Sequence, residues 1–278
     1  MSLLATQDLT IRFGGHVAVN AVTCSFEPGT LTAIVGPNGA GKTTYFNLIS
    51  GQLKASAGTV TLAGRDLSGH SASQRTRAGL GRAFQLTNLF PRLTVLENVR
   101  LAVQALADGD HRHGLNLWSI WSDHVALTKR ADEILDAVAM KDKAQEFVAN
   151  LPHGDQRKLE VALLMALNPK VYMFDEPTAG MNAAEAPVIL NLIRKLKADK
   201  SKTILLVEHK MDVVRELADR IIVLHNGSLV ADGEPAEVIA SPIVQEAYLG
   251  LAPQDASAQV DAPPHPGLPP PGGRSEQP

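Results

Sequence analysis

The fold is decided by a glycine-rich stretch that carries one lysine, Gly36-Pro37-Asn38-Gly39-Ala40-Gly41-Lys42-Thr43-Thr44. The apolar residues 31–35 before it predict a buried parallel strand, and residues 44–50 after it predict a helix that ends at Gly51. Glycines let a backbone wrap closely around phosphate oxygens, with amide N–H groups and the positive end of a helix directed at the anion. Strand, spacing and helix together predict a phosphate-binding loop.

Two side chains suit this loop to a nucleotide. Lys42 brings a positive charge to the β- and γ-phosphates. The Thr43 hydroxyl is placed to ligate the Mg²⁺ ion that accompanies those phosphates. The loop is therefore expected to hold the phosphates and the metal together.

Polar residues follow two further apolar strands. Residues 171–176 predict a buried strand that ends in Asp175 and Glu176, and residues 203–207 predict a parallel strand followed by His209. We expect Asp175 to hold Mg²⁺, often through water, and Glu176 to orient or deprotonate the attacking water. Because ligands meet the carboxyl ends of parallel strands, we expect His209 to contact the γ-phosphate.

Two more candidates lie nearer the N-terminus. Residues 3–13 predict an edge strand, followed by a turn and a second strand at residues 17–26. The ring of Phe13 either stacks on a purine base or packs beneath this turn, and we favour stacking. Residues 80–85 predict a strand ending in Gln85, which is then placed to reach phosphate or metal.

The remainder of the chain divides into a helical part, a hairpin and a tail. Residues 93–167 predict mainly helices, including one that begins with a turn at residues 151–156. Asn226-Gly227 predicts a hairpin turn within residues 221–230. The proline-rich residues 251–278 predict a disordered, non-catalytic tail. Two tryptophans in the helical part share a helix face that is either core or a docking patch, and we favour core: Trp118 and Trp121.

Composition sets limits on partners and compartment. The chain has 278 residues, 45% of them hydrophobic and 20% charged, which fits one large α/β domain with a tail. A net charge of -3 and the lack of a long basic block argue against nucleic-acid binding. Cys24 is the only cysteine, so a reducing compartment fits. No signal peptide or run of about 18 apolar residues is found, and we expect a soluble protein that reaches a membrane only through a partner.

With these residues placed, the chain resembles the ATP-binding-cassette (ABC) family over residues 3–250. The resemblance implies an α/β P-loop NTPase core, with a RecA-like mixed sheet and flanking helices, an antiparallel β subdomain and an inserted α-helical subdomain at about residues 93–167. This cassette would occupy residues 1–250. By this resemblance, Phe13 matches the family's adenine-stacking aromatic and residues 36–43 match its Walker A loop. Gln85 matches the Q-loop glutamine, which is a metal contact. Asp175 and Glu176 match the Walker B pair, and His209 matches the switch histidine.

The resemblance also implies ATP and Mg²⁺ as cofactors and a head-to-tail pair of ATPase subunits, identical or different. Each ATP is expected between one phosphate loop and the partner's signature loop, here residues 151–156, so that Gly154 and Gln156 contact the partner's nucleotide. This signature departs from the family's Leu-Ser-Gly-Gly-Gln at Pro152 and His153, because proline offers neither a hydroxyl nor an N–H donor. We therefore expect an asymmetric pair in which the site completed by this loop is slower.

Within the family, the sequence is most similar to ATPase subunits of bacterial branched-chain amino acid importers. That similarity implies two transmembrane permeases, an indirect link to a periplasmic or surface binding protein, and a place at the cytoplasmic face of the inner membrane. The alternatives are an exporter or lipid-extraction ATPase and a non-transport regulator. The similarity rests on several short motifs: residues 12–15, 84–90, 93–99, 176–182, 207–209 and 247–250.

Overall fold

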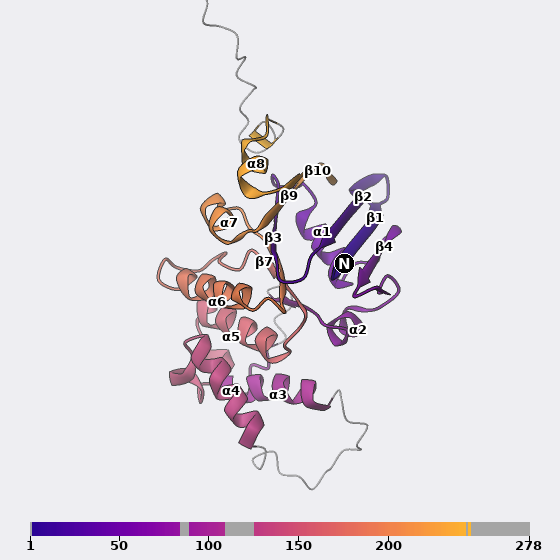
Figure 1. Cartoon of the computed structure of the whole chain (residues 1–278). Coiled ribbons are helices and arrows are strands. Elements are labelled where there is room, and N and C mark those ends of the chain that lie inside the picture. Colours follow the sequence, from indigo (N-terminus) through magenta and orange to yellow (C-terminus); the bar gives the residue numbers. More distant parts are fainter. Residues whose placement is uncertain (1, 84–88, 109–124, 243, 246–278) are drawn as a thin grey trace, which may run out of the picture.

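The computed structural model describes residues 2–83, 89–108, 125–242, 244 and 245. It has a central six-stranded sheet, a four-stranded antiparallel sheet on one side and helices on the other (Figure 1). The expected α/β fold is confirmed. Gln85, Trp118, Trp121 and the tail at residues 251–278 lie outside the described residues.

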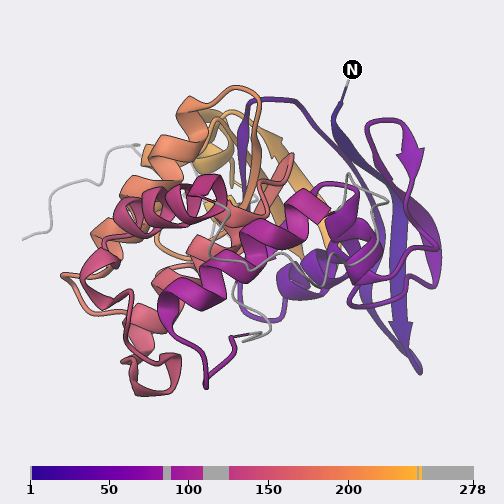
Figure 2. The same ribbon diagram turned by 90° about the horizontal axis from the view of Figure 1, so that it is seen from below.

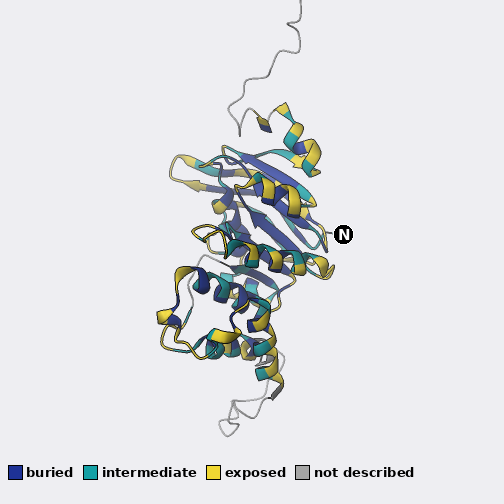
Figure 3. Cartoon of the chain, turned by 90° about the vertical axis from the view of Figure 1, so that its left-hand side faces the viewer, coloured by how far each residue is buried: buried dark blue, intermediate teal, exposed yellow. Residues whose placement is uncertain are grey.

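The central sheet is parallel except at one edge. Its order is β10-β9-β3-β8-β7-β6, and only β10 runs antiparallel to its neighbour. Helices cover one of its faces and the antiparallel sheet the other (Figure 1), and its strands are largely buried (Figure 3). This explains why β3 and β8 are continuous apolar runs. The strands are β3 (Leu31–Val35), β6 (Leu80–Ala83), β7 (Val171–Asp175), β8 (Thr203–Val207), β9 (Arg220–His225) and β10 (Ser228–Gly233).

One helix joins the two sheets. Helix α1 (Lys42–Ser50) begins directly after the phosphate loop and ends at Gly51, whose φ of 78° is left-handed as a glycine C-cap requires. Its Tyr45 and Phe46 are fully buried between the central and antiparallel sheets. The antiparallel sheet has the order β2-β1-β4-β5, and its strands are β1 (Leu4–Phe13), β2 (His16–Phe26), β4 (Ala57–Leu62) and β5 (Arg65–Asp66).

The prediction that residues 3–13 form an edge strand is wrong. Strand β1 pairs with β2 on one side and with β4 on the other, so it is internal to its sheet. The alternation of apolar residues reports which face of a strand is buried, whereas it carries no information about how many neighbours hydrogen-bond to its edges. Here the second neighbour comes from residues more than 40 positions further along the chain.

Most of the remaining helices cover the other face of the central sheet and one end of the molecule, whereas the short helix at residues 72–77 packs on the same side as α1 (Figures 1 and 2). Leu159, Ile189 and Ile193 pack with Tyr172 and Phe174 of β7 in one core. The chain turns at Pro152, and the helix that follows it starts at His153. These helices are α2 (Ala72–Arg77), α3 (Val95–Asp108), α4 (Val125–Ala137), α5 (His153–Ala166), α6 (Ala186–Ala198), α7 (Met211–Leu217) and α8 (Pro235–Ala240).

A buried arginine fixes the end of α1. Arg75, only 3% exposed, donates from Nη1 to the carbonyl oxygens of Leu48 and Ile49 at 2.8 Å each. Its other nitrogens reach the carbonyls of His70 and Ser68. The two Nη1 contacts add donors to carbonyl groups in the last turn of α1, where helical partners are lacking or shared. Arg75 therefore connects α2 to the helix that carries the phosphate loop.

Arg75→Met is expected to lower the free energy of unfolding by about 2 kcal/mol, because charged hydrogen bonds to buried carbonyls are lost. Urea unfolding would measure this change. Arg77→Met is the control, since Arg77 lies on the same helix but is exposed, and it should alter stability by less than about 0.5 kcal/mol. Equal midpoints for the two variants would contradict the assigned role of Arg75.

Candidate active site

The phosphate loop depends on close backbone packing at two glycines. A Cβ atom on Gly36 would lie 2.2 Å from the carbonyl oxygen of Leu224, and one on Gly41 would lie 2.6 Å from that of Ala18. Both glycines also have positive φ, 152° and 94°. Gly41 is the N-cap of α1 and no side chain caps that helix, so its first N–H groups remain for an anion.

Lys42 is folded across its own loop. Its Nζ donates to the carbonyl oxygens of Gly36 at 2.7 Å and Pro37 at 2.9 Å. Burial lowers the pKa of the Lys42 ammonium group, while the carboxylates of Glu176 and Asp175 oppose that shift. The lysine is thus held at the inner wall of the loop.

A cavity of about 270 Å³ lies over this loop. It brings together the predicted loop with Glu176 and His209, which follow β7 and β8 at the carboxyl edge of the sheet. Sequence reasoning missed His16, which lines the same cavity from the start of β2. The only feature of the sequence that pointed to His16 as a site residue was its position directly after the turn that follows Phe13. The complete lining is His16, Ala18, Asn38, Gly39, Ala40, Gly41, Lys42, Thr43, Thr44, Glu176 and His209.

Glu176 and His209 are in direct contact. His209 Nε2 lies 2.5 Å from Glu176 Oε1, and about 40% of each side chain is exposed. Glu176 has a φ of 50°, an uncommon conformation for a residue with a side chain. Its N–H donates to the carbonyl of Val207 at 2.9 Å, so the end of β8 holds this backbone in place.

A buried carboxylate joins the two loops that carry this pair. Glu208 is only 3% exposed and accepts from the Thr178 hydroxyl at 2.9 Å. It also accepts from the N–H groups of His209 at 2.8 Å and Lys210 at 3.3 Å. Glu208 therefore fixes the backbone of His209 relative to the turn that follows Glu176.

Asp175 ends β7 beside the cavity. Burial raises the pKa of its carboxyl group, although the neighbouring Arg82 guanidinium acts in the opposite direction. The Thr43 hydroxyl, on an exposed residue of the loop, offers a second oxygen. Within the described residues, no group of three or more His, Cys, Asp or Glu side chains could hold a metal alone. This donor set fits Mg²⁺ that is bound chiefly through nucleotide phosphates and water.

Besides Asp175, three predicted site residues outside the phosphate loop do not line this cavity. Phe13 is 51% exposed and pairs across the hairpin with His16, but it is not among the lining residues. Gly154 and Gln156 lie in the first turn of α5, and Gln156 Nε2 donates to the carbonyl of Leu151 at 3.0 Å.

The signature loop at Pro152 and Gly154 and the turn at Asn182 are each shaped by local contacts. Pro152 is the N-cap of α5 and supplies no side-chain cap. A Cβ atom on Gly154 would lie 2.3 Å from the Glu185 carboxyl group, so a larger residue there would require the Glu185 side chain to move. Asn182 Oδ1 accepts from the N–H groups of Ala184 and Glu185, while Glu185 Oε2 accepts from the Asn182 N–H. Asparagine thus caps the turn before α6.

Comparison with known proteins identifies the family. Residues 19–179, more than half of the chain, match the family model described as ABC transporter. The chain belongs to this family. Its residues 228–251 also match a model described as branched-chain amino acid ATP-binding cassette transporter. The family membership expected from the sequence is confirmed, and this ABC chain is an ATP-binding ATPase.

Individual relatives extend the match over nearly the whole cassette. The high-affinity branched-chain amino acid transport ATP-binding protein LivG of Salmonella typhimurium is 39% identical over 90% of this chain and 98% of its own length. BraF of Pseudomonas aeruginosa, described in the same words, is 36% identical with the same coverage. A solved ADP conformation of an ABC transporter's ATP-binding cassette superposes with a TM-score of 0.74 at 30% identity, covering 90% of this chain and all of that one.

Lys42→Ala is expected to raise the dissociation constant for ATP at least about tenfold, because a charged hydrogen bond to phosphate is worth about 1.5–3 kcal/mol. Titration with a fluorescent ATP analogue would measure it. Lys54→Ala, which removes an exposed lysine beyond α1, is the control and should leave binding unchanged. Equal affinity of the two variants would exclude Lys42 as a phosphate contact.

Proposed function

We propose that this ATPase powers an importer of branched-chain or other hydrophobic amino acids. The observation that carries the proposal is the similarity to LivG and BraF over 98% of their length. The match of residues 228–251 to the branched-chain model supports it independently, because this segment lies beyond the ABC transporter match. The chain would act at the cytoplasmic face of the inner membrane, attached through two permease subunits that receive cargo from a binding protein.

In this proposal, the site residues expected from the sequence have defined tasks. The loop N–H groups and Lys42 bind the phosphates, and the Phe13 ring stacks on adenine. Thr43 and Asp175 would hold Mg²⁺, with Gln85 as a further contact, and the bound ion would neutralise charge that develops on the phosphate oxygens. Glu176 orients the attacking water, and its contact with His209 keeps the carboxylate beside the cavity.

A second ATPase subunit would complete the site. Gly154 and Gln156 belong to α5 and do not line the chain's own nucleotide cavity, which agrees with a role at a partner's nucleotide. A solved cassette that superposes with a TM-score of 0.70 at 27% identity, covering 84% of this chain and 98% of that one, is a dimer in a post-hydrolysis state with ADP and Pi. The asymmetric pair expected from Pro152 remains part of this proposal.

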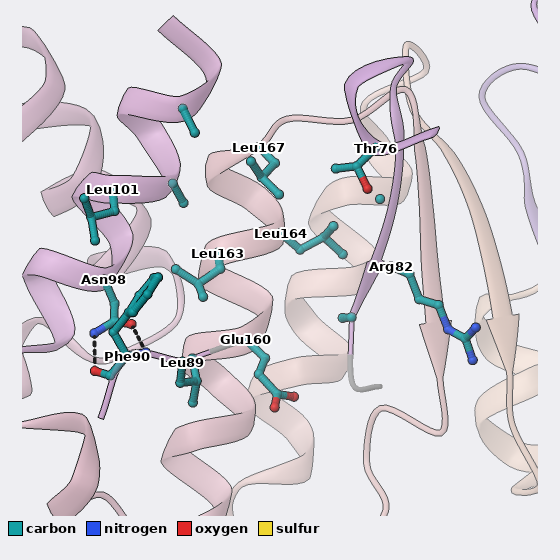
Figure 4. Close-up of a pocket in the computed structure, with 14 residues that line it drawn as sticks. Thr76, Arg82, Leu89, Phe90, Asn98, Leu101, Glu160, Leu163, Leu164 and Leu167 are labelled. Atoms are coloured by element: carbon teal, nitrogen blue, oxygen red, sulfur yellow. Dashed lines mark hydrogen bonds between the residues drawn. The ribbon is translucent and has the colours of Figure 1, made fainter. Parts of the chain in front are cut away.

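A groove beside β6 offers a docking place for the permeases (Figure 4). It measures about 460 Å³ and is lined mainly by apolar side chains of α3 and α5. Phe90 and Leu101 at this groove are 54% and 43% exposed. Asn98 accepts from the Phe90 N–H at 2.8 Å and donates back to its carbonyl at 3.1 Å, so the Phe90 backbone is fixed on α3. None of the helices in the described residues has the length and apolar character needed to cross a bilayer.

The transport assignment is tested on the co-expressed complex. ATP hydrolysis by the purified ATPases and permeases in lipid should rise when a binding protein loaded with a hydrophobic amino acid is added. Full activity of the chain alone, with no response to permeases or binding protein, would favour an exporter or regulator instead.

Glu176→Gln should lower the rate of ATP hydrolysis by this complex at least about a hundredfold while ATP binding persists, because water activation is lost.

Phe90→Asp is expected to reduce co-purification with the permeases at least about tenfold, because a charge replaces an apolar contact in the groove. Phe147→Asp is the matched control: Phe147 is 52% exposed and is not among the groove residues. Both variants should keep the ATP affinity of the unchanged chain. Equal recovery of permeases with both would show that the groove is not the docking place.

A further inference from the structure

Arg82 makes a buried ion pair with the carboxylate proposed to hold Mg²⁺. Its Nη2 lies 2.8 Å from Asp175 Oδ2, and the two side chains are only 5% and 9% exposed. Arg82 belongs to β6 and Asp175 to the end of the adjacent parallel strand β7. Oδ2 of Asp175 is thus paired with a fixed cation, whereas Oδ1 takes no part in this ion pair.

The same guanidinium is anchored to the helix that follows the phosphate loop. Its Nη1 donates to Asn47 Oδ1 at 2.7 Å and to Ser50 Oγ at 3.0 Å, and its Cζ lies 5.3 Å from the centre of the Phe46 ring. All three partners belong to α1. Arg82 Nε is buried and finds no hydrogen-bond partner in the described part of the chain, so the Nη contacts and the ring set its position.

We propose that Arg82 is a positioning residue that holds the Asp175 carboxylate in the orientation required for Mg²⁺. This inference rests on the magnesium role proposed for Asp175. The guanidinium joins three elements, β6, β7 and α1. Its Nη2 binds Asp175 Oδ2 while its Nη1 is held by α1, so the rigid guanidinium plane fixes the position of that carboxylate oxygen. A metal ligand held in this way needs no reordering when Mg²⁺ and nucleotide enter.

The alternative is that Arg82 serves only to stabilise the packing of β6 on β7. Loss of either partner of a buried ion pair is destabilising in any case, so stability alone cannot distinguish the two roles. The dependence of nucleotide binding on Mg²⁺ can distinguish them, because a change in the packing of β6 should affect the affinity for nucleotide equally with and without the metal.

The test compares binding of a fluorescent ATP analogue to the full chain in EDTA and during a Mg²⁺ titration. In Arg82→Met, affinity in EDTA should stay within about twofold of the unchanged chain, because Lys42 and the loop are intact. The Mg²⁺ concentration at half-saturation should rise about tenfold, as is typical when a residue that orients a metal ligand is lost. Arg82→Lys should recover part of this, since it keeps the charge but not the fork.

Three further variants make the result interpretable. Asp175→Asn tests the underlying assignment: if it leaves the Mg²⁺ dependence unchanged, the proposed metal role of Asp175 fails regardless of Arg82. Asn47→Ala removes one anchor and keeps the ion pair, so it should raise the half-saturating Mg²⁺ concentration less than Arg82→Met and provides a test if the latter does not fold. Arg220→Met is the control, because Arg220 pairs with Asp232 near the amino end of β3, away from the loop.

Two results would overturn the positioning role while Asp175→Asn behaves as proposed. One is a half-saturating Mg²⁺ concentration in folded Arg82→Met that is the same as, or lower than, that of the unchanged chain. That result would show that Arg82 either serves only as a structural contact or competes with the metal for Asp175. The other is an equal loss of affinity in EDTA and in Mg²⁺, which would place the effect on α1 and the phosphate loop.

Discussion

The structure depends on how closely the loop after β3 approaches its neighbours. The backbone at Gly36 and Gly41 passes the carbonyl oxygens of Leu224 in β9 and Ala18 in β2 at distances that leave no room for a Cβ atom. This packing joins the antiparallel sheet, the central sheet and α1 at one point. It also directs the N-terminus of α1 at the cavity, so the same packing that holds the two sheets together forms the anion site.

Charge is balanced around this loop by contacts that join different strands. Lys42 is held by loop carbonyls, and the nearby carboxylates Asp175 and Glu176 oppose the effect of burial on its pKa. Asp175 in turn is paired with Arg82, whereas Glu176 is in contact with His209. The two adjacent carboxylates therefore have different environments, one buried against a fixed cation and one exposed beside a histidine. Such a difference suits one to a metal and the other to water.

The sequence was informative wherever function follows from local spacing. The glycine stretch predicted the loop, and the rule that ligands meet the carboxyl ends of parallel strands placed Glu176 and His209 at the same cavity. It was uninformative where a contact joins distant residues. Arg82 and Asp175 are 93 positions apart, and His16 lines the cavity only because the β1–β2 hairpin reaches it. The second neighbour of β1 was missed for the same reason. Phe13 and Gln85 stay predictions.

Strand β6 contributes residues to the groove and also carries Arg82, which pairs with Asp175 beside the cavity. Gly81, Arg82 and Ala83 all line the groove, yet the Arg82 side chain points away from the groove's apolar side chains (Figure 4) and ends at Asp175 and α1. A partner that shifts β6 by a fraction of an ångström therefore moves the guanidinium relative to the carboxylate, because buried side chains at native packing density transmit displacement. If Asp175 holds Mg²⁺ as proposed, a shift of its carboxylate on metal binding would likewise act on Arg82 and on the strand that forms the groove wall. Coupling of this kind is reciprocal by thermodynamic necessity, so a permease that alters Mg²⁺ affinity must itself be bound differently when Mg²⁺ and nucleotide are present.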